Sequence, residues 1–208
     1  MTGDSLMSMT RPILGALLAL AAVGPVPGQT AIEITLKAGS QPEAATKEQL
    51  LRLLKSYDVS KWTFTKSVVI DQTLIPHSHP VLTLSTRHLR DDELLLTTYI
   101  HEQLHWYFVS RGKDTQEAVN ELQRVFPDAE TQPPGGSNGP QSTYQHMLVC
   151  LFEYKAAQEL LGELKARQVM EFWSHDHYTW VYRMVLERGR DIENVAAKFK
   201  LKPFAAGQ

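Results

Sequence analysis

The order of hydrophobic and polar positions along the chain predicts short strands first and long helices after them. Residues 31–37 alternate between apolar and polar side chains, as a half-buried strand does. Leucines then recur at helical spacing, which predicts a helix over about 47–57. Thr46 and Gln49 have the spacing of a capping box and therefore mark the expected start of that helix.

Two further strands are predicted where β-branched and aromatic residues gather. Residues 62–74 are rich in both, and residues 81–87 alternate clearly between apolar and polar side chains. The six residues between these strands, "IPHSHP", are expected to turn the chain. The pattern therefore predicts a β-hairpin formed by 62–74 and 81–87.

The strongest helical signal lies in the middle of the chain, over residues 90–112. Asp91 or Asp92 is expected to cap its start, where the helix dipole favours an acid, and Gly112 marks its end. A polar stretch follows and finishes in "TQPPGGSNGPQS", residues 131–142, which has the composition of an exposed loop.

Helices are also predicted for the rest of the chain. A second long helix is expected over 142–164, capped by Ser142 or Thr143, and a third helical region over about 169–188. Asp191 is placed to cap a short amphipathic helix near the C-terminus. Together these segments predict one small α+β domain with a short β-sheet and two long helices.

Composition and charge agree with a globular domain and exclude some partners. Of the 208 residues, 43% are apolar and 21% are charged, as in ordinary globular proteins. The formal net charge is -2 and no basic run is present, which argues against a nucleic-acid partner. The single cysteine, Cys150, excludes an intramolecular disulfide and is expected to be a small buried side chain.

The first residues of the chain differ from the rest. An uninterrupted apolar run of 11 residues, 13–23, follows Arg11 and is too short to cross a membrane, which takes about 20 residues. A basic residue, a short apolar run and small residues after it are typical of a secretory signal peptide. We therefore expect a signal peptide over 1–28 and a single mature domain over 29–208 that is secreted or periplasmic and has no transmembrane segment.

The motif that carries chemistry is "HEQLH", residues 101–105, inside the central helix. His101 and His105 lie one turn apart on the same face, so that both imidazoles can bind one Zn²⁺. Glu102 lies at the edge of that face, where its carboxylate can accept a proton from a water activated by the metal. The spacing predicts a zinc site with Glu102 as general base. The alternative is two core histidines bonded to backbone or hydroxyl groups.

A catalytic zinc usually has three protein ligands, and the second long helix offers two candidates for the third. His146 and Glu153 are seven residues apart and share one face, among apolar or small neighbours. They are separated by roughly 10 Å along the helix axis, too far for one zinc to bind both. The preference of zinc for imidazole favours His146, with Glu153 holding a ligand imidazole. Glu153 as the ligand, with His146 beside the oxyanion, is the alternative.

Other polar and aromatic residues are weaker candidates for function. His77 and His79 could bind a metal, but they lie in the expected turn, where polar residues commonly gather. His175 and His177 are expected to cap a helix, with a position in the cleft as the alternative, and Tyr178 is a candidate donor to an oxyanion. Four aromatic side chains are expected in the core: Trp106, Tyr107, Trp173 and Trp180.

The motif and the segment before it resemble a known class of enzymes. "HEQLH" resembles the active-site helix of the zincin metallopeptidases, and "VLTLSTR" ahead of it looks like their edge strand. The resemblance covers residues 81–112. It implies a zincin-like fold, in which the edge strand packs on the active-site helix, with His101 and His105 as ligands, Glu102 as base and a peptide along the edge strand. The longer HExxHxxGxxH pattern of the metzincins is absent.

The sequence therefore predicts a secreted zinc-dependent hydrolase, specifically a metallopeptidase that cleaves a peptide or protein substrate. A zinc-stabilised binding domain without turnover is the alternative, and Glu102 distinguishes the two because a structural site needs no base. A third hypothesis is an α+β interaction domain without metal. The sequence names neither the scissile bond nor the oligomeric state.

Overall fold

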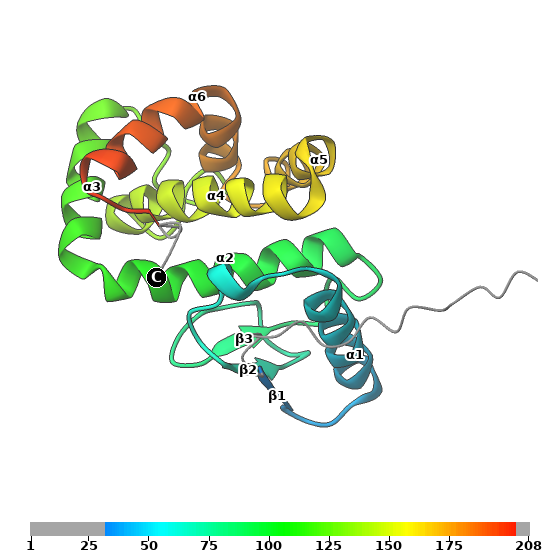
Figure 1. Cartoon of the computed structure of the whole chain (residues 1–208). Coiled ribbons are helices and arrows are strands. Elements are labelled where there is room, and N and C mark those ends of the chain that lie inside the picture. The colour runs from blue at the N-terminus through cyan, green and yellow to red at the C-terminus, as the bar shows by residue number, and fades with distance from the viewer. Residues whose placement is uncertain (1–31, 203–208) are drawn as a thin grey trace, which may run out of the picture.

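The computed structural model describes residues 32–202, in which a small sheet lies against a larger group of helices (Figure 1). The predicted α+β class is confirmed: the described chain has three short parallel strands and six α-helices. The predicted signal peptide lies outside the described residues. Within 32–202 no helix combines the length and the hydropathy needed to span a bilayer.

The sheet has the order β1-β2-β3, and both pairs of neighbours are parallel. Its strands are β1 (Glu33–Leu36), β2 (Ser67–Ile70) and β3 (Leu82–Leu84). The predicted hairpin is therefore wrong. Parallel pairing requires the chain to return along the sheet between β2 and β3, and the long connection allows this.

The connection between β2 and β3 folds back on the outer edge of β3. Backbone hydrogen bonds of 3.1 and 2.8 Å join His77 and Thr83 in an antiparallel bridge. The strand predicted over 62–74 is also shorter than expected, because Ser60–Trp62 forms a turn of 3₁₀ helix (η1) that packs against the central helix. Tertiary packing of the buried Trp62 overrides the β propensity of this segment.

The first helix, α1 (Gln41–Ser56), begins earlier than predicted. Its capping box is formed by Ser40 and Glu43, whose carboxylate accepts hydrogen bonds from the backbone N–H groups just before the helix. The expected cap, Thr46, is inside the helix and donates its hydroxyl to the carbonyl of Pro42 at 2.9 Å. Because proline is compatible with the first turn of a helix, Pro42 does not delay the start, and the helix begins directly after Ser40, the first residue able to cap it.

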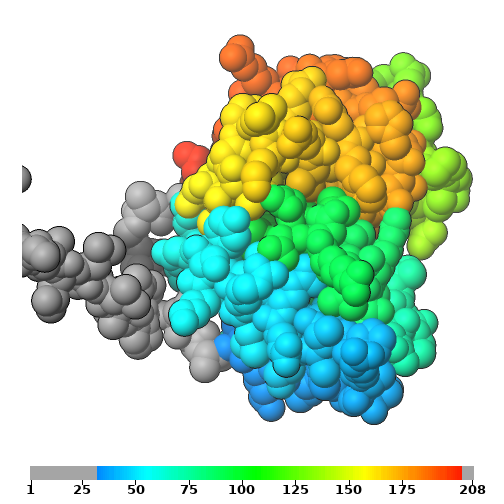
Figure 2. All heavy atoms as spheres, turned by 90° about the vertical axis from the view of Figure 1, so that its right-hand side faces the viewer, coloured from blue at the N-terminus to red at the C-terminus, as the bar shows by residue number. Residues whose placement is uncertain are grey.

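The helix α2 (Asp92–Ser110) is the centre of the molecule. It packs against β3 and α1 on one side and against three of the later helices on the opposite side (Figure 1). Figure 2 shows the same layers from another direction, with blue and cyan residues below, green atoms between, and yellow and orange helices above. The other helices are α3 (Gly112–Val125), α4 (Pro140–Leu161), α5 (Glu163–Trp173) and α6 (Thr179–Lys198).

Helix α3 was not predicted, because its polar composition hides a narrow buried stripe of Ala118, Val119 and Leu122. Helix α4 starts at Pro140, after Gly139, and so precedes the expected caps Ser142 and Thr143. The predicted third helical region is interrupted between α5 and α6, and the break expected at Gly189 is only a kink with non-helical angles at Arg188.

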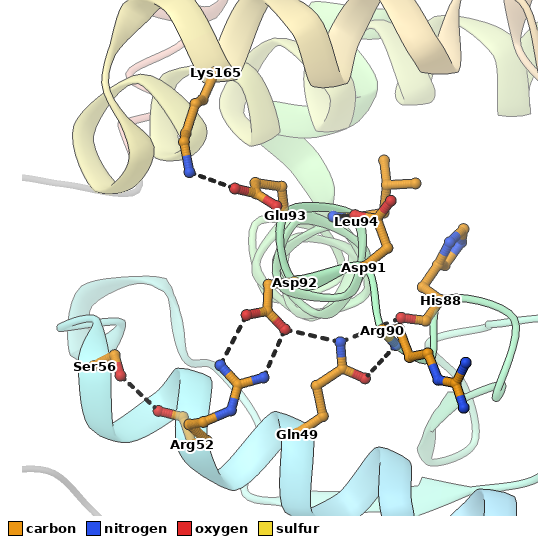
Figure 3. A network of polar contacts seen from close by, with 10 residues as sticks. All are labelled: Gln49, Arg52, Ser56, His88, Arg90, Asp91, Asp92, Glu93, Leu94 and Lys165. Atoms are coloured by element: carbon orange, nitrogen blue, oxygen red, sulfur yellow. Dashed lines mark hydrogen bonds and ion pairs between the residues drawn. The ribbon is translucent and has the colours of Figure 1, made fainter.

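The start of α2 is fixed from both sides by charged and polar contacts (Figure 3). Asp91 caps the helix by accepting the N–H of Leu94, as predicted. Asp92 accepts two hydrogen bonds of 2.8 and 2.7 Å from the guanidinium of Arg52 on α1, and Lys165 on α5 bonds Glu93 at 2.5 Å. The helix that carries "HEQLH" is thereby held in register with both layers.

Candidate metal centre

Three imidazoles from two helices converge below the surface of the molecule. His101 and His105 come from α2, and His146 comes from the facing side of α4. The ring centroids are 5.1 Å apart for His101 and His105, 5.7 Å for His101 and His146, and 4.9 Å for His105 and His146. One donor nitrogen from each ring lies within 4.8 Å of the others, which is a separation that a shared ion can bridge.

Hydrogen bonds orient two of the rings. Nδ1 of His101 is bonded to Oε2 of Glu153 at 2.8 Å, and Nδ1 of His146 donates to the backbone carbonyl of Ser142 at 2.7 Å. In both residues the Nε2 atom is thereby left for a ligand role. Within residues 32–202, the ring nitrogens of His105 form no hydrogen bond, which leaves them available for the same centre.

Glu153 contacts His101 and a second residue that the sequence did not single out. The hydroxyl of Tyr182, on α6, donates to the same oxygen, Oε2, at 2.9 Å. Tyr182 is fully buried, and so is the carboxyl group that it bonds. No sequence pattern marks Tyr182, because its contact with Glu153 depends on how α6 packs against α4.

Glu153 also belongs to a second close group of donor atoms, formed with His101 and Cys150. The sulfur of Cys150 is fully buried, as expected from the sequence, and burial raises the pKa of its thiol well above the usual value. Ionising a thiol at this depth is unfavourable unless a cation lies beside it.

Glu102 projects into a cavity beside the imidazoles. Its side chain is only 6% exposed, and among residues 32–202 its carboxyl oxygens have no hydrogen-bond partner. Burial, reinforced by the nearby Glu153, raises the pKa of Glu102 to about 8. A buried carboxyl group without a partner is destabilising for a fold, and such groups gather at functional sites.

Burial also keeps the imidazoles neutral. It lowers the pKa of His101 to about 4 and that of His146 to about 3. Burial, followed by the charges of His101, His146 and His79, also lowers the pKa of His105 well below the usual value. Burial raises the pKa of Glu153 to about 8. The donor set fits zinc, because neutral imidazoles are its ligands and a nearby cation would stabilise the ionised carboxylates.

Tyr178 closes one side of the cluster. Its ring centroid lies 4.3 Å from that of His146 and 6.3 Å from that of His101. The residue has a left-handed backbone conformation, with φ 49°, which is uncommon for a non-glycine residue and tends to occur at functional sites. Burial raises the pKa of Tyr178 to about 12, so its hydroxyl keeps the proton and acts as a donor.

The cavity has a volume of about 490 Å³, a typical size for a small-ligand site. His101, Glu102 and Tyr178 lie on its wall. Segments from both layers of the fold complete it: Leu74–Pro76 before β3, Ser85–His88 after β3, Pro133–Gly136 before α4, and Trp173 with His177 at the end of α5 and beyond it.

The remaining histidines occupy different surroundings. His79 is exposed and stacks on Trp106 with ring centroids 4.3 Å apart, so Trp106 is half-buried and not in the core as expected. His175 is exposed, whereas His177 bonds Asp176 at 2.8 Å and lines the cavity. Neither of these two caps α6, which begins without a side-chain cap.

The segment predicted as an exposed loop, 131–142, is partly buried. Gly135, Gly136 and Ser137 are buried, and the segment forms one wall of the cavity. A backbone that makes its own hydrogen bonds to neighbouring elements can be buried despite a loop-like composition.

No family model matches this chain, and no curated protein or solved structure was found to be similar to it. Function must therefore be argued from the site itself.

Proposed function

We propose that this protein is a secreted or periplasmic zinc-dependent hydrolase, and specifically a metallopeptidase. In this proposal His101, His105 and His146 bind Zn²⁺, Glu102 is the general base, and Glu153 orients His101. One observation carries the proposal: three imidazoles converge, and the cavity that reaches one of them, His101, is also lined by Glu102, whose carboxyl group has no hydrogen-bond partner among residues 32–202.

The choice of His146 as third ligand is supported by where Glu153 lies. Glu153 bonds Nδ1 of His101, which is the usual place for a carboxylate that supports a metal-binding histidine. His146 belongs to the group of three ring nitrogens and bonds the backbone through its other nitrogen. If Glu153 were the ligand instead, the metal would be bound by His101, Cys150 and Glu153, or Glu153 would have to release its hydrogen bond to His101.

A bound zinc ion would supply Lewis acidity, which makes water more acidic and a carbonyl group more electrophilic. The residues of the chain then have separate tasks. Glu102 accepts the proton of the attacking water and delivers it to the leaving nitrogen. Tyr178, whose hydroxyl keeps its proton, donates a hydrogen bond to the oxygen that gains negative charge.

The openness of the site supports a catalytic role over a structural one. Structural zinc sites are closed by four protein ligands, whereas catalytic sites keep an open position. Here three imidazoles form the group and the wall on which His101 and Glu102 lie faces a cavity. A zinc-stabilised binding domain would have no need for an unpartnered carboxyl group at that position.

The zincin-like part of the proposal is supported by α2 packing against the edge strand β3. One detail changes the expected substrate path. Because His77 already pairs with Thr83, a peptide cannot pair with that position of the edge. Strand β3 ends at Leu84, and Ser85, directly after it, lines the cavity, so we propose that the peptide lies beyond the paired part of the edge.

Metal analysis combined with an activity screen tests this proposal. The purified mature protein should contain close to one zinc per chain and hydrolyse members of a mixed peptide library. A chelator should abolish hydrolysis, and added zinc should restore it. Protein that contains no zinc after expression in zinc-supplemented medium, or hydrolysis that resists complete removal of metal, would overturn the proposal.

A further inference from the structure

The cavity beside the proposed zinc site has an apolar side that the proposed reaction does not use. We propose that this side is a subsite for a large, uncharged apolar side chain of the peptide substrate, adjacent to the scissile bond. This inference rests on the proposed function for the identity of the substrate, but the apolar site can be tested without hydrolysis.

The first wall of the subsite is the segment Leu74–Pro76. Ile75 is 82% exposed and Leu74 is 49% exposed, although both line the cavity. These are among the most exposed large apolar residues of the described chain. When an apolar group of a ligand covers such side chains, apolar surface is removed from water, and this favours binding.

This wall is held in place and cannot fold away into the core. His77, directly after it, is joined to Thr83 of β3 by two backbone hydrogen bonds. The indole N–H of Trp106, on α2, donates to the carbonyl of Ser78 at 2.9 Å. The exposed position of Ile75 is therefore built into the fold, which lowers the entropic cost of binding.

A second wall is formed by Pro133, Pro134 and Gly136. It is fixed to the start of α6, because the N–H of Thr179 donates to the carbonyl of Pro134 at 2.9 Å and the N–H of Trp180 donates to that of Gly135 at 3.0 Å. These bonds also satisfy helix N–H groups that would lack partners.

Glycine is required in this wall. A Cβ atom at Gly136 would lie 2.0 Å from the backbone oxygen of Glu130, so the segment approaches its neighbour more closely than any other residue permits. The wall is thus preformed, and with Trp173 it gives the cavity a second rigid apolar surface.

The charges around the cavity favour an uncharged group. Arg87, the basic side chain on its wall, is paired with Asp176, which also bonds His177. No free cation is therefore offered to an acidic side chain within the described part of the cavity wall. The carboxyl groups of Glu102 and Glu153 lie on the same cavity wall and would repel an acidic side chain. A basic side chain placed against the apolar walls would lose its hydration without gaining a hydrogen bond from Leu74–Pro76 or the prolines.

The position of the subsite connects it with the proposed reaction. His101 and Glu102 line the same cavity as Ile75 and Pro134, so a side chain between the two walls belongs to a residue at the reacting bond. A volume of about 490 Å³ accommodates an aromatic or leucine side chain together with the adjoining backbone.

Matched peptides and matched variants test the inference. A series of peptides that differ at one residue beside the cleaved bond should be hydrolysed with the highest kcat/KM when that residue is Phe or Leu, and with on the order of 10- to 100-fold lower values for Ala, Asp or Lys. Ile75→Asp should reduce this preference by raising KM for the Phe and Leu peptides more than for the Ala peptide.

The control variant is Leu164→Asp, which changes an equally exposed leucine, 73% exposed, on α5 and away from the cavity. It should leave the preference intact. Equal hydrolysis of all peptides by the wild type, or the same effect from Ile75→Asp and Leu164→Asp, would overturn the subsite.

A binding measurement separates the subsite from the proposed function. The neutral apolar fluorophore N-phenyl-1-naphthylamine should bind the wild type saturably, and Ile75→Asp should weaken this binding where Leu164→Asp does not. If no peptide is hydrolysed but the probe binds in this way, the hydrolase proposal fails and the apolar site stands. If the probe does not bind, or binds both variants alike, the apolar site is wrong whatever the enzyme does.

Discussion

Oε2 of Glu153 lies 2.8 Å from Nδ1 of His101, although the two residues are 52 positions apart and on different helices. The same oxygen accepts the hydroxyl of Tyr182 at 2.9 Å. Three helices, α2, α4 and α6, thus meet at one carboxyl oxygen. The contact fixes the ring of His101 and leaves Nε2 as the nitrogen available to a metal.

The first prediction concerns this contact. Glu153→Gln keeps the shape and the hydrogen bond but removes the negative charge, so the affinity for zinc should fall by about 10- to 100-fold. Tyr182→Phe should have a smaller effect, because it removes only a hydrogen bond to the carboxylate. Competition with a chromogenic chelator measures both affinities.

Cys150→Ala is the control for the other group of donor atoms, which contains His101, Cys150 and Glu153. It should retain zinc. If Cys150→Ala loses zinc while His146→Ala keeps it, the metal is bound by that second group and the ligand set proposed above is wrong.

The second prediction concerns the three imidazoles. His101→Ala, His105→Ala and His146→Ala should each lose stoichiometric zinc and with it the stability that zinc adds. At a free zinc concentration 100 times the Kd, this contribution is about 2.7 kcal/mol. Elemental analysis and thermal unfolding with and without zinc measure the two effects. His175→Ala, at an exposed position, should change neither quantity.

The sequence predicted part of this site because helical spacing is a local property. His101 and His105 are one turn apart, and the two-turn spacing of His146 and Glu153 puts both on the side of α4 that faces α2. Tyr182 was missed because its contact depends on how α6 packs against α4, which no local pattern encodes.

The fold shows the same limit. The long central helix and its cap at Asp91 follow from local signals, and they were predicted. The direction in which β2 and β3 pair is a non-local property. The short segment 75–80 has the composition of a turn, but its backbone bonds the edge of β3 and the sheet is parallel. The buried wall at Gly135–Ser137 was likewise hidden by a loop-like composition.

The third prediction concerns pH. His88 is 6% exposed and packs edge-on against Trp173, and burial, followed by the charge of Arg87, lowers the pKa of His88 from 6.5 to about 4. Between these two values the unfolded chain binds a proton that the folded chain does not. The free energy of unfolding should therefore fall as the pH drops from about 6.5 towards 4, by at most about 1.4 kcal/mol per pH unit from this residue.

His88→Asn isolates this contribution, because asparagine does not titrate. The variant should be less stable than the wild type at pH 7, where a packed ring is lost, and the difference should shrink at pH 5. Urea unfolding at the two pH values measures it, with the exposed His175→Asn as control. A difference in the free energy of unfolding that stays constant between pH 7 and pH 5 would show that folding does not lower the pKa of His88.

The fourth prediction concerns export. If residues 1–28 are a signal peptide, material recovered outside the cytoplasm should begin near Gln29. N-terminal sequencing or intact mass measurement gives the answer. Soluble exported protein that still carries the apolar run 13–23 would contradict the expectation.

The last prediction separates an enzyme from a zinc-stabilised binding domain, and it uses Glu102. Glu102→Gln keeps the size of the side chain but cannot accept a proton, and Glu102 makes no hydrogen bond within residues 32–202 that the change would break. The variant should therefore retain zinc. In the metal-free protein it should also become more stable relative to the wild type as the pH rises from about 4.5 to about 8. Burial raises the pKa of Glu102 from 4.5 to about 8, so over this range the unfolded wild type releases a proton that the folded wild type keeps.

Hydrolysis by Glu102→Gln should fall by about 10² to 10⁴ in kcat, the usual effect of removing a general base. Zinc content and circular dichroism of the same preparation verify that the site and the fold are intact. Turnover at the wild-type rate would exclude Glu102 as the base. Loss of zinc would make Glu102 a ligand or a support for one, since a side chain that acts only on water can be neutralised without releasing the metal.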